Sequence, residues 1–186
     1  MYICQEYLIE HAKKFYGGLQ RAGGDLQFNH ALRVAELTLR FWENFSVFPV
    51  SREYVIALFH DVLEDTAFDL ADIEIALKPC YTAMQIRAIT DGIVWLTNEY
   101  TKEKYPNLNR KARKNLELER LLKAPEYIQE IKLLDIYDNL QDIEKTGKFA
   151  KVWVSEKEQW IAALKGRREI KEMVTQRLNQ IKQKIK

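Results

Sequence analysis

Residues 54–66 read YVIALFHDVLEDT, and this segment decides which fold the sequence predicts. Its first ten residues are apolar nearly all round a helical projection, which is typical of a helix buried at the centre of a domain. Ser51 stands shortly before the segment and is suited to cap the N-terminus of that helix. The same segment carries one of the three histidines of the chain and three carboxylates, which an ordinary core helix lacks.

Apolar residues recur at helical spacing along nearly the whole chain, and strand-like alternation is rare. The sequence therefore predicts an all-α fold. Caps, glycines and prolines place the other helices at about residues 2–15, 29–45, 70–78, 81–97, 109–123 and 125–144. A polar loop is expected at 98–108. Ser155 and Glu158 form a capping box for an amphipathic C-terminal region, about 155–186, that Gly166 interrupts.

The composition is that of an ordinary soluble domain, with 47% hydrophobic and 30% charged residues. A chain of 186 residues is long enough for one sizeable core, so a single domain is expected over residues 1–186. Cys4 and Cys80 form no CxxC pair and no disulfide framework, which fits a reducing compartment. The sequence contains no signal-peptide core and no apolar run of membrane length. These features predict a cytoplasmic protein without a membrane partner.

Positive charge is concentrated near the end of the chain, because residues 165–186 contain eight Lys or Arg against two Glu. A solvated helix face is favoured over a surface for nucleic acid or acidic lipid, so nucleic acid is a disfavoured partner. The C-terminal helix packs either on its own domain or on another subunit of a homo-oligomer. The run NRKARKNLELER, residues 109–120, can bring Arg110, Lys111 or Arg113 to a polyphosphate, although alternating charges are more typical of a solvated face.

The polar residues of the central segment have the spacing of a metal site. On one helix, His60 and Asp61 diverge by about 100°, so both can reach an ion that lies over the ridge between them. Glu64 and Asp65 follow one turn later on the same side. The HD dipeptide alone is weak evidence, because it also occurs by chance.

His30 and Asp135 lie on the apolar stripes of two other predicted helices, where a hydrophobic residue would be expected. A buried carboxylate needs a counter-charge or a raised pKa, and a divalent cation supplies the counter-charge. Taken singly, His30 can be a satisfied core histidine, and Asp135 a buried cap or an ion-pair partner. The ordered set H…HDxxED…D instead favours a metal site with nitrogen and oxygen ligands, which suits Mn²⁺, Fe²⁺ or Zn²⁺ better than Ca²⁺.

Four motifs over about residues 11–145 resemble one known family: GGLQRAGGDLQFNH (17–30), HDVLEDT (60–66), DGIVWLT (91–97) and IKLLDIYDN (131–139). The family is that of the HD-domain metal-dependent phosphohydrolases. The closest branch comprises the RelA/SpoT-type guanosine polyphosphate 3′-pyrophosphohydrolases and the stand-alone small alarmone hydrolases. The resemblance implies an HD-domain helical bundle, a small nucleotide as substrate, and hydrolysis of the 3′-pyrophosphate of (p)ppGpp, a reaction of the stringent response.

The resemblance also implies a role for particular residues. It gives one metal ion four ligands, His30, His60, Asp61 and Asp135. The ion is usually Mn²⁺, with Fe²⁺, Zn²⁺ or Mg²⁺ as alternatives. Glu64 and Asp65 match the acidic pair that activates water, while Arg21 and Asn139 match positions that contact the substrate. Physical chemistry agrees, because a metal lowers the pKa of bound water and a neighbouring carboxylate takes its proton.

The sequence departs from the family pattern near the nucleotide. FYGGL (15–19) stands where AHxGQ is usual, and LQF (26–28) replaces PYI. These changes leave open a nucleotidase or a phosphatase that acts on another small phosphate ester. A non-catalytic nucleotide-sensing module would be marked by loss of Glu64 and Asp65, and both are present. His11 is the one histidine outside the ordered motif, so a two-metal phosphodiesterase is disfavoured.

Overall fold

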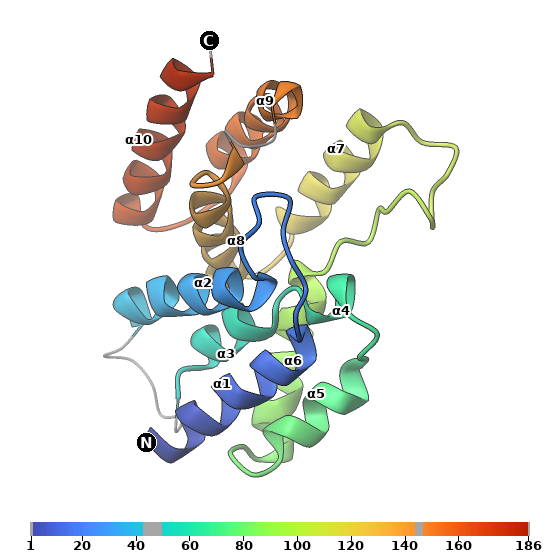
Figure 1. The fold of residues 1–186 in the computed structure, drawn as a ribbon, viewed down its shortest axis with the longest axis vertical. Helices are drawn as coiled ribbons and strands as arrows, with labels where there is room; N and C mark the ends of the chain where they lie inside the picture. Colours follow the sequence, from blue (N-terminus) through green and yellow to red (C-terminus); the bar gives the residue numbers. More distant parts are fainter. Residues whose placement is uncertain (1, 43–49, 144–146, 186) are drawn as a thin grey trace. The chain divides into compact units, whose positions relative to one another are not determined.

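The protein is all-α, as the sequence predicts. The computed structural model describes residues 2–42, 50–143 and 147–185 (Figure 1). Its helices are α1 (Tyr2–Tyr16), α2 (Gln27–Trp42), α3 (Arg52–Phe59), α4 (Val62–Asp65), α5 (Leu70–Leu77), α6 (Ala83–Leu96), α7 (Arg110–Leu121), α8 (Glu126–Asn139), α9 (Lys148–Ala163) and α10 (Arg168–Lys184). The chain separates into two compact units, Met1–Thr97 and Asn98–Lys186, and each is described by itself. The single domain expected over residues 1–186 stays a prediction.

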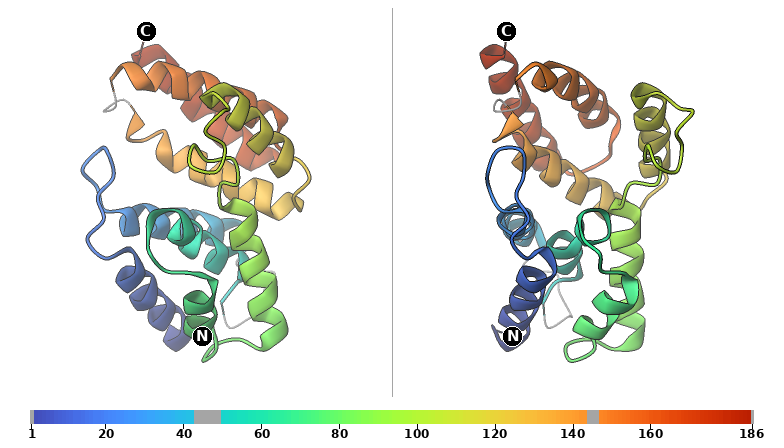
Figure 2. Two further views of the ribbon diagram at one scale, coloured as in Figure 1. Left: turned by 90° about the vertical axis from the view of Figure 1, so that its right-hand side faces the viewer. Right: turned by 45° about the vertical axis from the view of Figure 1, so that its right-hand side comes forward.

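Helix α3 forms the centre of the first unit, as its apolar sequence predicts. Every side chain from Tyr54 to Phe59 is fully buried, and α3 packs against α2 and α6 (Figure 2). Ser51 caps the helix, since its side-chain oxygen accepts a hydrogen bond from the backbone N–H of Tyr54. Burial of each large apolar side chain stabilises the unit by about 1.5–3 kcal/mol. We therefore attribute the position of the polar residues that follow α3 to this rigid core.

The central helix breaks at the polar motif instead of running through it. Helix α3 ends at Phe59 and α4 begins at Val62, so His60 and Asp61 form the junction between them. Nδ1 of His60 donates to the carbonyl of Ala57 over 2.7 Å, the group that the amide of Asp61 would bond in a continuous α-helix. The expectation of one uninterrupted helix through residue 63 was therefore wrong at this point. The break allows His60 and Asp61 to turn toward the same point.

The loop between α1 and α2 is held by backbone turns at two glycines. Gly17 and Gly24 have φ values of 53° and 85°, a region that favours glycine because it has no Cβ. The N–H of Arg21 donates to the carbonyl of Asp25 over 2.9 Å, and the N–H of Gly24 donates to the carbonyl of Arg21 over 2.9 Å. These bonds give the segment that carries Arg21 a defined conformation.

The second unit is built around α8, whose residues Ile128–Ile136 are all buried. Helix α10 packs on α8 and α9 through its buried stripe of Ile170, Val174, Leu178 and Ile181. The amphipathic C-terminal helix thus packs on helices of its own unit. No helix in the described part of the chain combines the length and apolar character that a membrane span requires.

Two expectations for the C-terminal region had different outcomes. Helix α9 begins at Lys148, so Ser155 lies inside it and the predicted capping box with Glu158 was wrong. The capping pattern lies here about two turns inside a continuous helix. The interruption at Gly166 was correct, since this residue lies between α9 and α10. A Cβ there would lie 3.0 Å from Cγ of Glu130, which explains why a glycine separates the two helices.

Candidate metal centre

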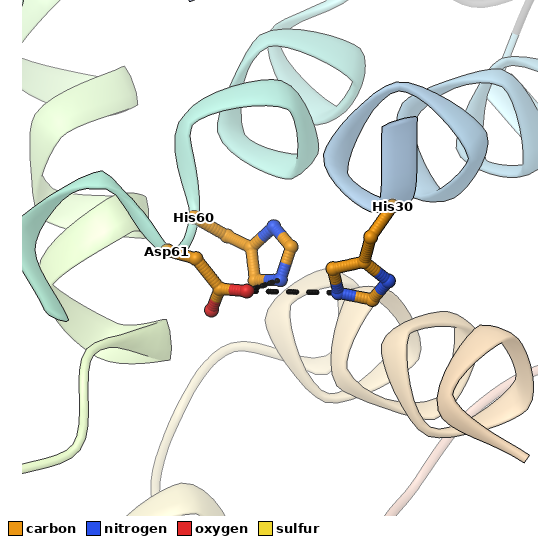
Figure 3. Close-up of side chains that lie close together, drawn as sticks. All are labelled: His30, His60 and Asp61. Carbon is orange, nitrogen blue, oxygen red and sulfur yellow. Dashed lines mark ion pairs between the residues drawn. The ribbon is translucent and has the colours of Figure 1, made fainter. Parts of the chain in front are cut away.

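Three of the predicted ligands converge in the first unit. His30 projects from α2, while His60 and Asp61 come from the α3–α4 junction (Figure 3). Oδ2 of Asp61 lies 3.1 Å from Nε2 of His60 and 3.6 Å from Nε2 of His30. Ligand atoms of the three residues all lie within 4.8 Å of one another. Residues separated by a whole helix in the sequence therefore meet at one point, as the motif predicts.

The hydrogen bond of His60 determines which ring nitrogen faces Asp61. A carbonyl oxygen only accepts, so the bond to Ala57 requires a proton on Nδ1 of His60. In the neutral ring, Nε2 then presents its lone pair toward Oδ2 of Asp61, 3.1 Å away. Two electron pairs at this distance repel unless a proton or a cation lies between them. The backbone carbonyl thus fixes the tautomer in which Nε2 of His60 is able to bind a metal ion.

The spacing and chemistry of the three groups fit a divalent transition metal ion. Ligand atoms that lie about 2.1 Å from a common ion are about 3 Å apart at right angles and about 3.4 Å apart at the tetrahedral angle, which is close to the separations of 3.1 and 3.6 Å from Asp61. Both histidine side chains are only 1% exposed, whereas that of Asp61 is 18% exposed. Two imidazoles and one carboxylate are typical ligands of Mn²⁺, Fe²⁺ and Zn²⁺. The cluster is therefore a candidate centre for a divalent metal.

Gln27 contacts this centre, although the sequence analysis did not identify it as a site residue. Its side-chain amide donates to Oδ2 of Asp61 over 2.6 Å, and its side chain is buried. Its backbone N–H donates to the carbonyl of Leu19 over 2.9 Å, so Gln27 connects the loop of Arg21 to Asp61, a candidate metal ligand. The signal in the sequence was a polar residue three positions before His30, on the same face of α2. Such an amide orients the carboxylate that it bonds.

The acidic pair occupies α4, one turn beyond Asp61. Glu64 and Asp65 are both exposed, in contrast to the buried histidines, so solvent and substrate can reach them. Partial desolvation, followed by the negative charges of Asp61 and Glu64, raises the pKa of Asp65 to about 6. A carboxylate with this pKa takes up a proton near neutral pH more readily than an ordinary one. The pair therefore has the position and the chemistry of proton acceptors, and its catalytic role stays a prediction.

Asp135 and Asn139 belong to the second unit, on the last two turns of α8. Asp135 is buried, and its Oδ2 lies 2.7 Å from Nζ of Lys132. Asn139 donates to the other carboxylate oxygen, Oδ1, over 2.6 Å. The sequence analysis left open that Asp135 is an ion-pair partner, and the structure shows this ion pair with Lys132. The roles of Asp135 as a metal ligand, and of Asn139 and Arg21 as substrate contacts, stay predictions.

The departure from the family pattern at residues 15–19 has a structural explanation. Tyr16 is 1% exposed, and its hydroxyl donates to the carbonyl of Leu58 over 3.2 Å. Tyr16 therefore packs in the core against α3 rather than presenting a polar group to a ligand. Leu19, by contrast, is 41% exposed. Tyr16 therefore uses its hydroxyl within the core, and the apolar side chain of Leu19 has no hydrogen-bonding group to offer a ligand.

Comparison with known proteins identifies the fold. A solved structure of a metazoan ortholog of SpoT, which hydrolyses ppGpp and plays a role in starvation responses, matches with a TM-score of 0.73 and 20% sequence identity. The match covers 95% of this chain and 94% of that one. No family model matches the sequence, and no curated protein matches it. The structural likeness shows that this chain shares the fold of that protein, in agreement with the predicted all-α bundle.

Proposed function

We propose that this protein is a metal-dependent phosphohydrolase that removes pyrophosphate from the 3′ position of (p)ppGpp. The observation that carries the proposal is the convergence of His30, His60 and Asp61 in a fold shared with a ppGpp hydrolase. Asp135 is the proposed fourth ligand. The ion is Mn²⁺ by preference, and the protein acts in the cytoplasm as part of the stringent response.

A divalent ion held by these residues supplies charge neutralisation for a phosphate and lowers the pKa of water. The residues of the chain perform the remaining tasks. Gln27 keeps the carboxylate of Asp61 in one orientation through the 2.6 Å hydrogen bond. The proposed role of Arg21 is to bind the phosphates, because a guanidinium recognises phosphate oxygens by two parallel hydrogen bonds.

The proposed reaction balances as a simple hydrolysis. Water attacks the phosphorus atom that is attached to the ribose 3′ oxygen, and the bond between these two atoms breaks. Glu64 accepts a proton from the attacking water, and Asp65 supports it at the exposed end of the site. The oxygen of the attacking water becomes part of the released pyrophosphate. The 3′ oxygen of the nucleotide takes up a proton and becomes a hydroxyl group. The products from ppGpp are GDP and pyrophosphate.

A panel of substrates tests this proposal. Purified protein with Mn²⁺ is incubated with ppGpp, NADPH, deoxynucleoside monophosphates and a cyclic dinucleotide, and the products are separated by chromatography. We expect GDP and pyrophosphate from ppGpp, and loss of this activity in Asp61→Ala and Glu64→Ala. The catalytic assignment fails if the wild-type protein hydrolyses nothing in the panel, or if both variants keep the full rate.

A nucleotidase or phosphatase for another small phosphate ester is the second candidate. It is favoured by the core position of Tyr16 and by Gln27 in the LQF segment, because both residues stand where the family pattern has other groups near the nucleotide. The same panel separates the two candidates. Release of inorganic phosphate from a monophosphate, with ppGpp left intact, would identify the second.

A further inference from the structure

The loop that carries Arg21 folds as a short hairpin between α1 and α2 (Figure 1). Gln20 and Leu26 form an antiparallel bridge, and the N–H of Arg21 donates to the carbonyl of Asp25 over 2.9 Å. The turn closes where the N–H of Gly24 donates to the carbonyl of Arg21, also over 2.9 Å. This pairing places Arg21 opposite Asp25, next to the turn of the hairpin.

The carboxylate of Asp25 joins this hairpin to the first two turns of α2. Its Oδ1 accepts hydrogen bonds from the backbone N–H of Leu26 and from Nδ2 of Asn29, each over 2.8 Å. Its Oδ2 accepts a bond from a guanidinium nitrogen of Arg33 over 2.6 Å. Asn29 and Arg33 are four positions apart on α2 and stand before and after His30 in the sequence. The carboxylate therefore fixes the hairpin to the helix segment that carries a candidate metal ligand.

The contacts of Asp25 are those of an ionised carboxylate. Burial by itself would raise the pKa of Asp25, but the hydrogen bonds from Asn29 and Arg33, together with the charge of Arg33, outweigh burial and lower this pKa. Hydrogen bonds to an ionised group are shorter than those between neutral groups and about twice as strong. The negative charge of Asp25 therefore strengthens the attachment of the hairpin to α2, and an uncharged amide of the same shape would weaken it.

The base of the hairpin is connected to the candidate metal centre. The carbonyl of Leu19 accepts a hydrogen bond from the backbone N–H of Gln27, and the side chain of Gln27 donates to Oδ2 of Asp61 over 2.6 Å. Arg21 is two residues beyond Leu19, so the backbone between them spans no more than about 7 Å. The backbone of Arg21 is thus fixed relative to Asp61 at the base of the hairpin and relative to α2 near its turn.

We propose that Asp25 is a positioning residue, whose carboxylate holds the hairpin on α2 so that the guanidinium of Arg21 meets the phosphates of the bound substrate. This role depends on the proposed function, in which Arg21 binds these phosphates. Confining a long side chain and its loop before the substrate arrives reduces the conformational entropy that is lost on binding. Since Asp25 acts through Arg21 and does not touch the substrate itself, it affects substrate affinity more than the chemical step.

Steady-state hydrolysis of ppGpp with Mn²⁺ tests this role. We expect Asp25→Asn to raise KM by about fivefold or more and to change kcat by less than about twofold, because substrate binding is weakened before the reaction begins. Arg33→Met removes the charged partner and should also raise KM. Asp25→Glu keeps the charge and should recover most of the affinity. Glu74→Gln, which removes an exposed carboxylate of α5, is the control and should leave both constants unchanged.

A double variant shows whether Asp25 acts through Arg21. Arg21→Ala should raise KM at least as much as Asp25→Asn does. Adding Asp25→Asn to Arg21→Ala should then have no further effect, because residues that act as a unit are not additive. A further rise in KM in the double variant, or a loss of kcat with KM unchanged in Asp25→Asn, would overturn the positioning role.

Two measurements do not require hydrolysis. Hydrogen exchange of the metal-free protein should be faster at the amides of Arg21 and Gly24 in Asp25→Asn than in the wild type, whereas unchanged exchange would contradict the attachment. Calorimetric titration with ppGpp and Mn²⁺ in the Glu64→Ala background measures substrate binding alone, and adding Asp25→Asn should weaken it.

These measurements separate the role of Asp25 from the proposed reaction. Hydrolysis of ppGpp with a KM that Asp25→Asn leaves unchanged would overturn the positioning role and leave the proposed function standing. Binding of ppGpp that depends on Arg21 and Asp25, in a wild-type protein that does not hydrolyse it, would overturn the proposed reaction and support the positioning role.

Discussion

Two aspartates in apolar helical surroundings, Asp61 and Asp135, are accommodated in opposite ways. Asp61 stands where the helix breaks, so its carboxylate faces two imidazoles and the amide of Gln27. Asp135 lies inside the continuous helix α8. Lys132, one turn before it, forms an ion pair with its Oδ2, and Asn139, one turn after it, donates a hydrogen bond to its Oδ1. Inside a helix, the charge of a buried carboxylate is thus compensated by residues of the same helix. At a helix break, the carboxylate can also contact residues of another helix.

The largest effect is expected from removal of the acid at the helix break. We expect Asp61→Ala to lower the rate of ppGpp hydrolysis by at least about 1,000-fold, because the proposed metal centre loses one of its two carboxylate ligands. Titration with Mn²⁺, followed by its paramagnetic resonance signal, should show a matching loss of metal binding. His11→Ala, which removes the histidine outside the motif, is the control and should keep both properties. Full activity of Asp61→Ala would rule out the proposed centre.

The compensation in α8 is tested by removing the positive partner of Asp135. Lys132→Met leaves a buried carboxylate without its ammonium and should lower the free energy of unfolding by about 3–5 kcal/mol. The double variant Lys132→Met/Asp135→Leu removes both charges and should recover most of that loss. Urea denaturation of the metal-free proteins measures both values. A double variant as unstable as Lys132→Met would contradict the ion pair as the source of the effect.

Gln27 gives Asp61 a hydrogen-bond partner from another helix, α2. Gln27→Leu keeps a buried side chain of similar size but removes the bond to Oδ2. We expect Mn²⁺ affinity to fall by about 10–100-fold, as for other residues that orient a metal ligand. The matched control is Gln176→Leu, an exposed position on α10, which should leave the affinity unchanged. Unaltered Mn²⁺ binding by Gln27→Leu would show that Asp61 is oriented without it.

The smallest expected effect is a pH dependence that arises at Asp65, beside Asp61. The pKa of Asp65 is raised from 3.8 to about 6, so between these values the folded protein binds more protons at this group than the unfolded chain. Stability of the metal-free protein should therefore decrease as pH rises from about 4 to about 6. Thermal unfolding across this range should show a shallower decrease for Asp65→Asn.

Asp91→Asn removes an exposed carboxylate of α6 and serves as the control for this pH series. It should keep the slope of the wild type. An identical slope in Asp65→Asn and the wild type would mean that ionisation of Asp65 does not oppose folding.

The accuracy of the sequence-based predictions differs between local and long-range features. The cap at Ser51 was identified correctly, because a cap depends on a few adjacent residues. The break at His60 was missed, because the competing bond to Ala57 depends on a side-chain rotamer. The capping pattern at Ser155 misled, because such a pattern also occurs inside helices whose start is set by packing.

The sequence by itself determined the helical class of this protein and the groups that need a compensating charge. Apolar periodicity is a local property, and a polar residue on an apolar stripe is visible in the chain itself. Only the tertiary structure decided which partner each group received. Gln27 and Asp61 are 34 positions apart, and their hydrogen bond exists because α2 packs against α3. Packing between helices depends on the shapes of many side chains together, so no local pattern specifies which two polar groups will meet.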